Sequence, residues 1–180
     1  MESKMRRWAM RRILTVVVAF LPLLIPAPVF AKADISKITI KGANLKTPIE
    51  ITDSKTLANF NVWTGPGTSG TIPQEANKFI IDWSRGVTER PKALQRYEVF
   101  FYAKLPNERL VYVVFYEYDP ATECGYIYLP GKTDEWYRLN VGTIFHGVEG
   151  CWFRAWNTWD SIARPLIEGA KVTGSGTGHD

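Results

Sequence analysis

The sequence is poor in the residue types that carry most metal binding and nucleophilic catalysis. Its 180 residues include two cysteines and two histidines, and one of the histidines, His179, lies next to the C-terminus. There is no Cys-x-x-Cys pair and no Gly-x-Ser-x-Gly motif, so His146 is the single histidine available as a base or ligand in the body of the chain. We therefore expect no metal site, no cofactor and no catalytic triad.

An excess of charge is also missing once the first 31 residues are set aside. The whole chain has a formal net charge of +4, but residues 1–31 contain five basic residues and one acidic residue. The whole chain has 22 basic and 18 acidic residues, so the part that follows residue 31 contains 17 of each kind. A near-neutral remainder lacks the basic surface that attracts nucleic acids and anionic membranes. We expect neither as a partner, apart from the contact of the leader with a membrane.

The leader has the organisation of an export signal. Basic residues precede an apolar stretch over residues 13–25, and small residues follow it. Cleavage after Ala31 and cleavage after Ala33 both leave small residues at the two positions before the cleaved bond where signal peptides require them. The sequence thus predicts a protein exported to the periplasm or the extracellular space, with a signal peptide over residues 1–31 or 1–33. The alternative is a membrane tether formed by an uncleaved signal, although Pro22, Pro26 and Pro28 interrupt the run.

The remainder is of a size that suits one globular domain, which we place at residues 34–171, followed by a disordered tail at 172–180. Both cysteines, Cys124 and Cys151, fall in this exported part. An even number of cysteines in an oxidising compartment predicts a Cys124–Cys151 disulfide, and the alternative is two free thiols.

Residues 97–129 hold three runs dense in β-branched and aromatic residues, which predict three antiparallel strands. The break at residues 105–108 is a tight turn with Pro106 and Asn107 at its tip. The predicted pairs are Phe101 with Tyr112, Val99 with Val114, Tyr97 with Tyr116, Phe100 with Val113 and Tyr102 with Val111. A loop over residues 119–123 then places Tyr126 beside Tyr116 and Tyr128 beside Val114.

Alternation along these strands makes one face rich in tyrosine. Its predicted members are Tyr97, Phe101, Tyr112, Tyr116, Tyr126 and Tyr128. The opposite face has the composition of an ordinary core: Phe100, Val111, Val113, Phe115, Ile127 and Leu129. A buried tyrosine needs a partner for its hydroxyl group and an exposed one offers a contact surface, so we interpret the first face as a binding face.

Other segments supply the remaining elements. A hairpin is predicted over residues 35–51, with Pro48 on an edge strand. A short helix is predicted near residues 53–60, where side-chain oxygens at its start can cap the N-terminus. Short strands are predicted at 79–83, 136–139 and 151–156. A helix is predicted over 158–170, with Trp159, Ile162, Leu166 and Ala170 on its apolar side and a kink or break at Pro165. Residues 65–70 match Gly-x-Gly-x-x-Gly but lack the strand before and the helix after that the dinucleotide motif requires.

These elements predict an α+β fold with a mainly antiparallel sheet, and the alternative is an all-β sandwich. Several segments also resemble an uncharacterised family of secreted bacterial proteins of unknown function. They are ITIKGANLKTPIEITD, FIIDWSRG, VYVVFYEYDP, and GYIYLPG followed by WYRLNVGTIF. The resemblance covers most of the chain after the leader and implies no activity.

The functional prediction rests on the aromatic residues. We expect a non-catalytic binding module that holds a glycan, a peptide or a protein ligand on aromatic rings. The predicted ligand-binding residues are Tyr97, Tyr112, Tyr116, Tyr126, Tyr128, Trp83 and Asp82. The alternative is a hydrolase of cell-wall or extracellular polymer that uses carboxylates such as Asp82 and Glu117, which would have to converge across a cleft.

Overall fold

The computed structural model describes residues 33–42, 44–68, 79–90, 92 and 94–175. The predicted signal peptide therefore lies almost wholly outside the described residues, as do the last five residues of the predicted tail. Within the described ranges, no helix combines the length and the apolar composition needed to cross a membrane.

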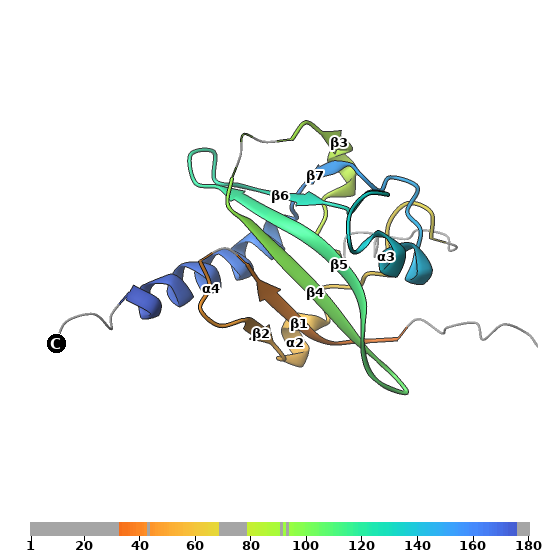
Figure 1. Cartoon of the computed structure of the whole chain (residues 1–180), viewed down its shortest axis with the longest axis horizontal. Helices are drawn as coiled ribbons and strands as arrows, with labels where there is room; N and C mark the ends of the chain where they lie inside the picture. The colour runs from red at the N-terminus through yellow and green to blue at the C-terminus, as the bar shows by residue number, and fades with distance from the viewer. Residues whose placement is uncertain (1–32, 43, 69–78, 91, 93, 176–180) are drawn as a thin grey trace, which may run out of the picture. The chain divides into compact units, whose positions relative to one another are not determined.

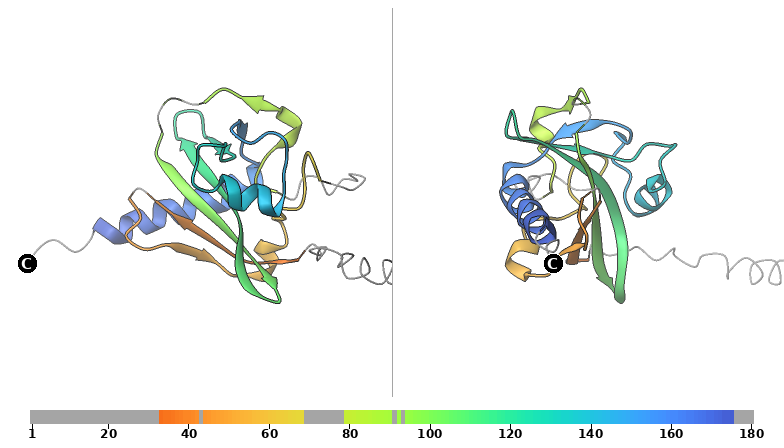
Figure 2. Two further views of the ribbon diagram at one scale, coloured as in Figure 1. Left: turned by 45° about the vertical axis from the view of Figure 1, so that its right-hand side comes forward. Right: turned by 60° about the vertical axis from the view of Figure 1, so that its left-hand side comes forward.

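The domain is an α+β fold built on a seven-stranded antiparallel sheet in the order β2-β1-β4-β5-β6-β7-β3 (Figure 1). The strands are β1 (Ile35–Lys41), β2 (Ile49–Ile51), β3 (Val87–Thr88), β4 (Arg96–Leu105), β5 (Asn107–Asp119), β6 (Cys124–Tyr128) and β7 (Trp152–Arg154). The helices are α2 (Ser54–Leu57), the 3-10 helix η3 (Trp83–Arg85), α3 (Tyr137–Thr143) and α4 (Asn157–Ser175). Helices α4 and α2 lie on one side of the sheet and α3 on the other (Figure 2).

The β4–β5 hairpin forms the centre of the sheet, as its aromatic and β-branched sequence predicts. The pairs Phe101–Tyr112, Val99–Val114, Tyr97–Tyr116 and Phe100–Val113 are confirmed. A bulge between Phe101 and Tyr102 corrects the last predicted pair, because Tyr102 lies opposite Leu110 and not Val111. The extra residue keeps Val111 in the core, where it is buried.

Strand β6 has a different register from the predicted one. Tyr126 lies opposite Glu117 and Tyr128 opposite Phe115, whereas Ile127 lies opposite Tyr116. The loop is one residue shorter than expected because Asp119 and Cys124 already form a pair. A shift of one residue moves every side chain to the other face. Tyr126 and Tyr128 therefore do not share a face with Tyr97, Tyr112 and Tyr116.

Two predicted short strands are wrong. Residues 79–83 contain only an isolated bridge between Ile81 and Ala155, and the chain then turns into η3 with Asp82 as its N-cap. Residues 136–139 enter helix α3. Local propensity is outweighed there by tertiary contacts, since the rings of Trp136 and Phe100 pack at 5.4 Å and Asn140 bonds to β5.

The main core lies between α4 and the sheet. Trp159 packs edge-on against Phe60 at 5.3 Å and against Tyr116 at 5.9 Å. The buried face of α4 is Trp159, Ala163 and Ile167, whereas Leu166 is 40% exposed. The predicted apolar face was thus rotated, and the helix continues through Pro165 to Ser175.

The predicted disulfide is wrong, because Cys124 and Cys151 are both free thiols. Cys124 is the first residue of β6, whereas the Cys151 carbonyl accepts a hydrogen bond from Leu129, just beyond the end of that strand. Five residues of strand separate the two positions by roughly 16 Å. A disulfide needs Cα atoms within about 7 Å of each other, so the sheet register keeps the cysteines apart.

Candidate functional site

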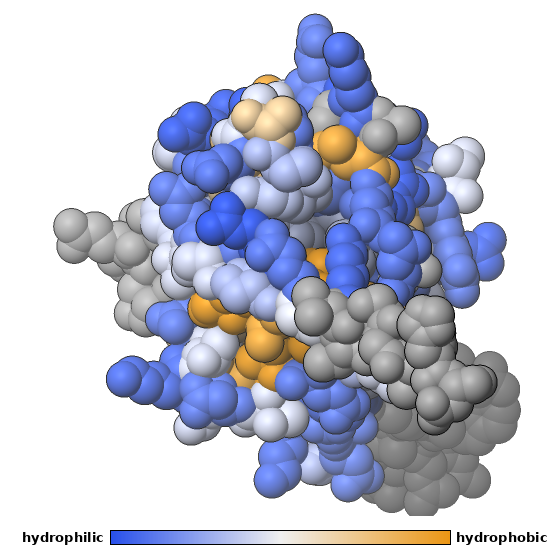
Figure 3. Space-filling model, turned by 90° about the vertical axis from the view of Figure 1, so that its left-hand side faces the viewer, coloured by the Kyte–Doolittle hydropathy of each residue, from blue (hydrophilic) through white to orange (hydrophobic). Residues whose placement is uncertain are grey.

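A groove opens between the second half of α4 and the end of the sheet where β4 begins and β5 finishes. Its volume is about 330 Å³. We call it the helix–sheet groove. It is lined by Leu94, Gln95, Tyr97, Tyr116, Tyr118, Pro120, Arg164, Ile167, Glu168 and Lys171. Figure 3 shows the domain from the side on which α4 ends, where apolar surface lies among hydrophilic side chains.

Two of the predicted ligand-binding tyrosines, Tyr97 and Tyr116, line this groove. They are 2% and 0% exposed, so they form its floor and not an open platform. Their ring centroids are 6.4 Å apart. The Tyr116 hydroxyl donates to Asp160 (2.9 Å), and burial followed by the Asp160 charge raises the pKa of Tyr116. The Tyr97 hydroxyl is buried with no hydrogen-bond partner in the described part of the chain.

Two cations of α4 lie at the groove. Arg164 donates to the Tyr118 hydroxyl at 2.5 Å, and its guanidinium lies 5.3 Å from the centre of that ring. The Lys171 ammonium donates to the side chain of Gln95 at 2.9 Å and lies 5.6 Å from the centre of the Tyr97 ring. Both partners are neutral oxygens. Among the described residues, neither cation forms an ion pair with a carboxylate.

Tyr112 and Trp83 belong to a separate buried cluster around His146. The ring of His146 lies 5.3 Å from Trp83 and 5.7 Å from Tyr112. Its Nδ1 donates to the carbonyl oxygen of Pro66 (2.7 Å), because that oxygen can only accept. Burial lowers the pKa of His146 and raises the pKa of Tyr112. These residues pack the core and do not reach the helix–sheet groove.

Gly65 and Gly67 of the glycine-rich segment pack against this same cluster. A Cβ atom on Gly65 would lie 2.6 Å from the Trp83 ring, and one on Gly67 would lie 2.3 Å from the Phe145 carbonyl oxygen. Both glycines also have positive φ angles, 115° and 71°. Close packing and backbone conformation therefore account for Gly65 and Gly67 without a bound nucleotide.

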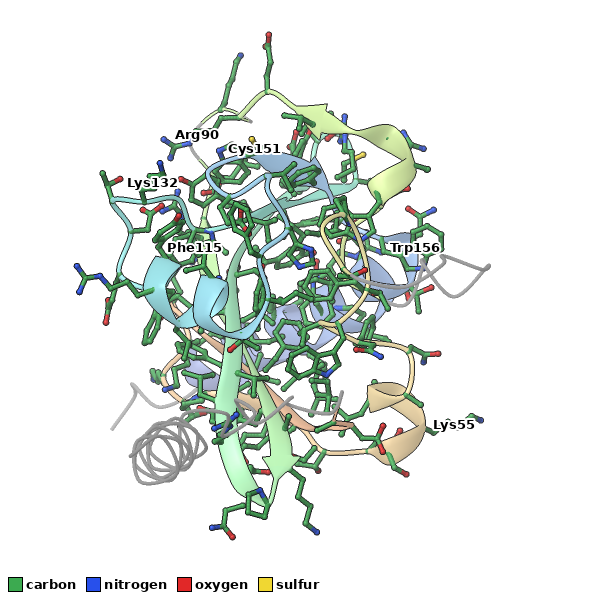
Figure 4. The ribbon with its side chains drawn as sticks, turned by 90° about the vertical axis from the view of Figure 1, so that its right-hand side faces the viewer. Lys55, Arg90, Phe115, Lys132, Cys151 and Trp156 are labelled. Atoms are coloured by element: carbon green, nitrogen blue, oxygen red, sulfur yellow. The ribbon has the colours of Figure 1, made fainter. Side chains whose placement is uncertain are left out.

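Tyr126 and Tyr128 lie on the opposite side of the sheet, with Phe115 and Trp152. Tyr128 stacks on Phe115 at 6.0 Å and packs against Trp152 at 5.0 Å. Its hydroxyl donates to Asp134, and burial followed by this hydrogen bond raises the pKa of Tyr128. Arg154 lies 4.4 Å from the centre of the Tyr126 ring. Figure 4 shows this side, with Phe115 and Arg90 labelled.

These rings have little free surface, since Phe115, Tyr126 and Trp152 are 7%, 8% and 8% exposed. Guanidinium groups lie over them: Arg96 is 4.8 Å from the centre of Phe115, and Arg90 is 5.7 Å from that of Trp152. The side chains therefore form a packed layer and not an exposed stacking platform.

The two carboxylates of the hydrolase alternative do not share a described cavity. Asp82 accepts from Ser84 and pairs with Arg85 at 3.1 Å. Glu117 is buried on the same face of the sheet as Tyr126 and pairs with Arg96 at 3.1 Å. The helix–sheet groove contains one carboxylate, Glu168. Over the same ranges, no three residues of His, Cys, Asp and Glu cluster as metal ligands would.

A second cavity, of about 410 Å³, lies between the start of β1 and helix α2. Short polar side chains such as Asp34, Ser36 and Thr52 line it, with Phe60 as its single aromatic ring and no cation. Few groups there could fix the orientation of a ligand, so the helix–sheet groove is the better candidate site.

Sequence reasoning missed Tyr118, Arg164 and Lys171. The sequence contained a signal for two of them: Lys171 directly follows the predicted helix 158–170 and lies seven residues after Arg164, so a helix longer by one residue puts both on one face. Comparison with known proteins adds no identification: no protein-family model, curated protein or solved structure matches the chain.

Proposed function

We propose that this protein is an exported, non-catalytic binding module whose ligand occupies the helix–sheet groove. The observation that carries the proposal is a groove that combines aromatic rings in its lining, Tyr97, Tyr116 and Tyr118, with two cations whose hydrogen bonds go to neutral oxygens. Ligand sites are concave, largely apolar and furnished with a few polar groups that fix orientation. A volume of about 330 Å³ accommodates a short segment of a glycan or peptide, or a protein side chain with its neighbours.

The chemistry of the groove supports binding over hydrolysis. General acid–base cleavage of a glycoside requires two carboxyl groups facing one bond. Glu168 is the sole carboxylate of the groove, and Asp82 and Glu117 are each engaged by an arginine elsewhere. The residues at the groove can orient and hold a ligand but supply no acid–base pair.

Export is supported by the pattern of the first 33 residues alone. Because both cysteines are free, no disulfide adds a second argument for an oxidising compartment. We place the domain in the periplasm or the extracellular space.

The test is a glycan and peptide array probed with the exported protein and with Tyr118→Ala. Tyr118 is half-buried at the groove, and loss of its ring should weaken binding roughly five- to tenfold, by about 1 kcal/mol or more. Phe145→Ala is the matched control, because Phe145 is an aromatic residue that is 57% exposed and does not line the groove. Equal binding by Tyr118→Ala, or consumption of an arrayed ligand, would contradict the proposal.

A further inference from the structure

We infer that the ligand of the helix–sheet groove is an organic carboxylate, with its acid group held by Arg164 and Lys171 and its apolar body beside Leu94, Tyr118 and Pro120. This inference rests on the proposed binding role of the groove and names the chemistry that the groove selects. It is carried by three features of the site: two cations whose hydrogen bonds go to neutral oxygens, acidic neighbours that disfavour a second negative charge on the ligand, and an unpartnered tyrosine hydroxyl.

The two cations are held in place by bonds that a ligand can improve. Arg164 donates to the Tyr118 hydroxyl and Lys171 to the Gln95 amide oxygen, which are both neutral acceptors. Hydrogen bonds from a cation to a carboxylate are roughly twice as strong as neutral ones. An incoming carboxylate therefore gains energy by replacing either neutral partner, without breaking an ion pair of the described residues.

The charge of the groove favours a single negative charge. Glu168 lies four residues after Arg164 and three before Lys171, so it is next to both on the helix. The carboxylates of Glu123 and Asp160 also lie close enough to act on Arg164. A dianion such as a phosphate monoester would place its second charge near these acidic groups, where like charges repel. A monoanion such as a carboxylate meets less of this repulsion.

The Tyr97 hydroxyl is the independent sign of a polar ligand group. The side chain is 2% exposed, it lines the groove, and its hydroxyl has no partner among the described residues. A buried polar group without a hydrogen bond is unfavourable, because it has lost its water partners without a replacement. The Lys171 ammonium lies 5.6 Å from the centre of the same ring, so Tyr97 belongs to the part of the groove that Lys171 borders.

The apolar part of the site supplies the rest of the specificity. Leu94, Pro120 and the ring of Tyr118 border the groove above a floor of Tyr97 and Tyr116. Such walls bind an alkyl chain or an aromatic ring through burial of apolar surface. Small inorganic anions lack this part and should bind poorly.

The experiment is calorimetric titration of the exported protein with matched probes. Octanoate and 3-phenylpropionate should bind, and octanol and 3-phenylpropanol should bind at least about tenfold more weakly. Phenyl phosphate should also bind more weakly than 3-phenylpropionate, and Glu168→Gln should narrow that difference. A hydrophobic peptide with a free C-terminus, compared with its amidated form, shows whether peptides can supply the carboxylate.

Arg164→Gln and Lys171→Gln should each weaken binding of the carboxylates about tenfold, and binding should fall as salt is added. Lys55→Gln is the control, because Lys55 is an exposed lysine of α2 outside the groove. Unchanged melting temperatures would show that these variants fold.

The outcomes separate the two proposals. If acids and alcohols bind equally well and Tyr118→Ala weakens both, the groove binds ligands but the carboxylate inference is wrong. If carboxylates bind and neither cation variant changes their affinity, the inference is also wrong. If no probe and no array ligand binds the protein, the proposed function itself fails.

Discussion

Asn140 shows how one side chain can complete a sheet. Strand β6 ends opposite Phe115, so β5 has no neighbouring strand on that side at Val113. The Asn140 side-chain amide takes the place of a neighbouring strand there. It accepts a hydrogen bond from the Val113 N–H at 2.9 Å and donates one to the Val113 carbonyl at 2.7 Å. Asn140 is fully buried, so water cannot substitute for it. This pair of hydrogen bonds fixes α3 against the sheet.

Asn140→Ala should therefore lower the free energy of unfolding by about 2–4 kcal/mol, since it leaves a buried N–H and a buried carbonyl without partners. Urea unfolding followed by tryptophan fluorescence measures the change. Asn59→Ala is the control, because Asn59 is exposed and donates a single hydrogen bond of 3.3 Å. A loss below about 0.5 kcal/mol for Asn140→Ala would contradict this account.

His146 makes stability depend on pH. Burial lowers its pKa in the folded protein, although the Pro66 carbonyl and the charge of Glu149 oppose the shift. Trp83, Tyr112 and Phe79 surround the rest of the ring. The unfolded chain, with a histidine pKa of about 6.5, therefore binds the proton more readily. Stability is complete above that value and decreases as the pH falls from about 6.5 toward the lower folded pKa.

The urea midpoint should decrease between pH 7.5 and 5.5, and His146→Asn should flatten that slope. His179→Asn should leave the slope unchanged, because His179 is near the C-terminus and outside the described core. Asp160 acts in the opposite direction at lower pH, since burial raises its pKa. If the urea midpoint of His146→Asn decreased with falling pH as steeply as that of the unmodified protein, the pH dependence would belong to other titratable groups.

At the scale of elements, the sequence predicts the β4–β5 hairpin and its central pairs, but not the form of its turn. Asn107 already pairs with Leu105, so the pairs between the turn and the bulge differ by one residue from those predicted. The bulge compensates for that difference, and the predicted pairs from Phe101–Tyr112 onward are correct. The loop before β6 leaves two choices that differ by one residue. Each gives a credible face pattern, since Tyr126, Ile127 and Tyr128 are all apolar enough to be buried.

Helix α3 and the face of α4 show a different limit. The segment at residues 136–139 has strand-like composition, and only its long-range contacts with β4 and β5 make it helical. In α4, Ile162, Leu166 and Ala170 fit a helical period nearly as well as Ala163 and Ile167. The choice depends on which residues meet Tyr116 and Ile127 across the core. Tertiary packing decides both cases.

The groove was missed for the same reason. Tyr97 and Tyr116 could be identified as unusual from the sequence, but their burial under α4 could not. Arg164 and Lys171 become neighbours of these rings only when α4 is docked on the sheet. A tyrosine-rich pair of strands predicts a contact surface, and in this protein helix α4 covers much of that surface.

The sheet register also determines the state of the cysteines. Because Cys124 and Cys151 lie about five residues apart along β6, both should be free in the folded protein. Alkylation of the denatured, unreduced protein should add two labels, and a reducing agent should not change the melting temperature. A mass lower by two hydrogens, with no label added, would show a disulfide and contradict this register.

At the scale of the whole domain, the two sides of the sheet have different roles. The α4 side contains the main apolar core and, at one end, the helix–sheet groove. On the other side, α3 packs against β5, and arginines lie over Phe115, Tyr126 and Trp152. Rings on both sides are buried, and the groove differs in placing the half-buried Tyr118 ring beside two cations whose hydrogen bonds go to neutral oxygens.

The central claim is that ligands bind in the groove and not on the layer of arginines and rings. The most direct measurement is the change in amide chemical shifts of the isotope-labelled protein during titration with its tightest-binding array ligand. We predict shifts at residues 94–97, 116–120 and 164–171, which in Arg164→Gln should require about tenfold more ligand to reach the same size. Shifts centred on Tyr126, Tyr128 and Trp152, with residues 164–171 unchanged, would contradict the claim and return the site to the opposite face of the sheet.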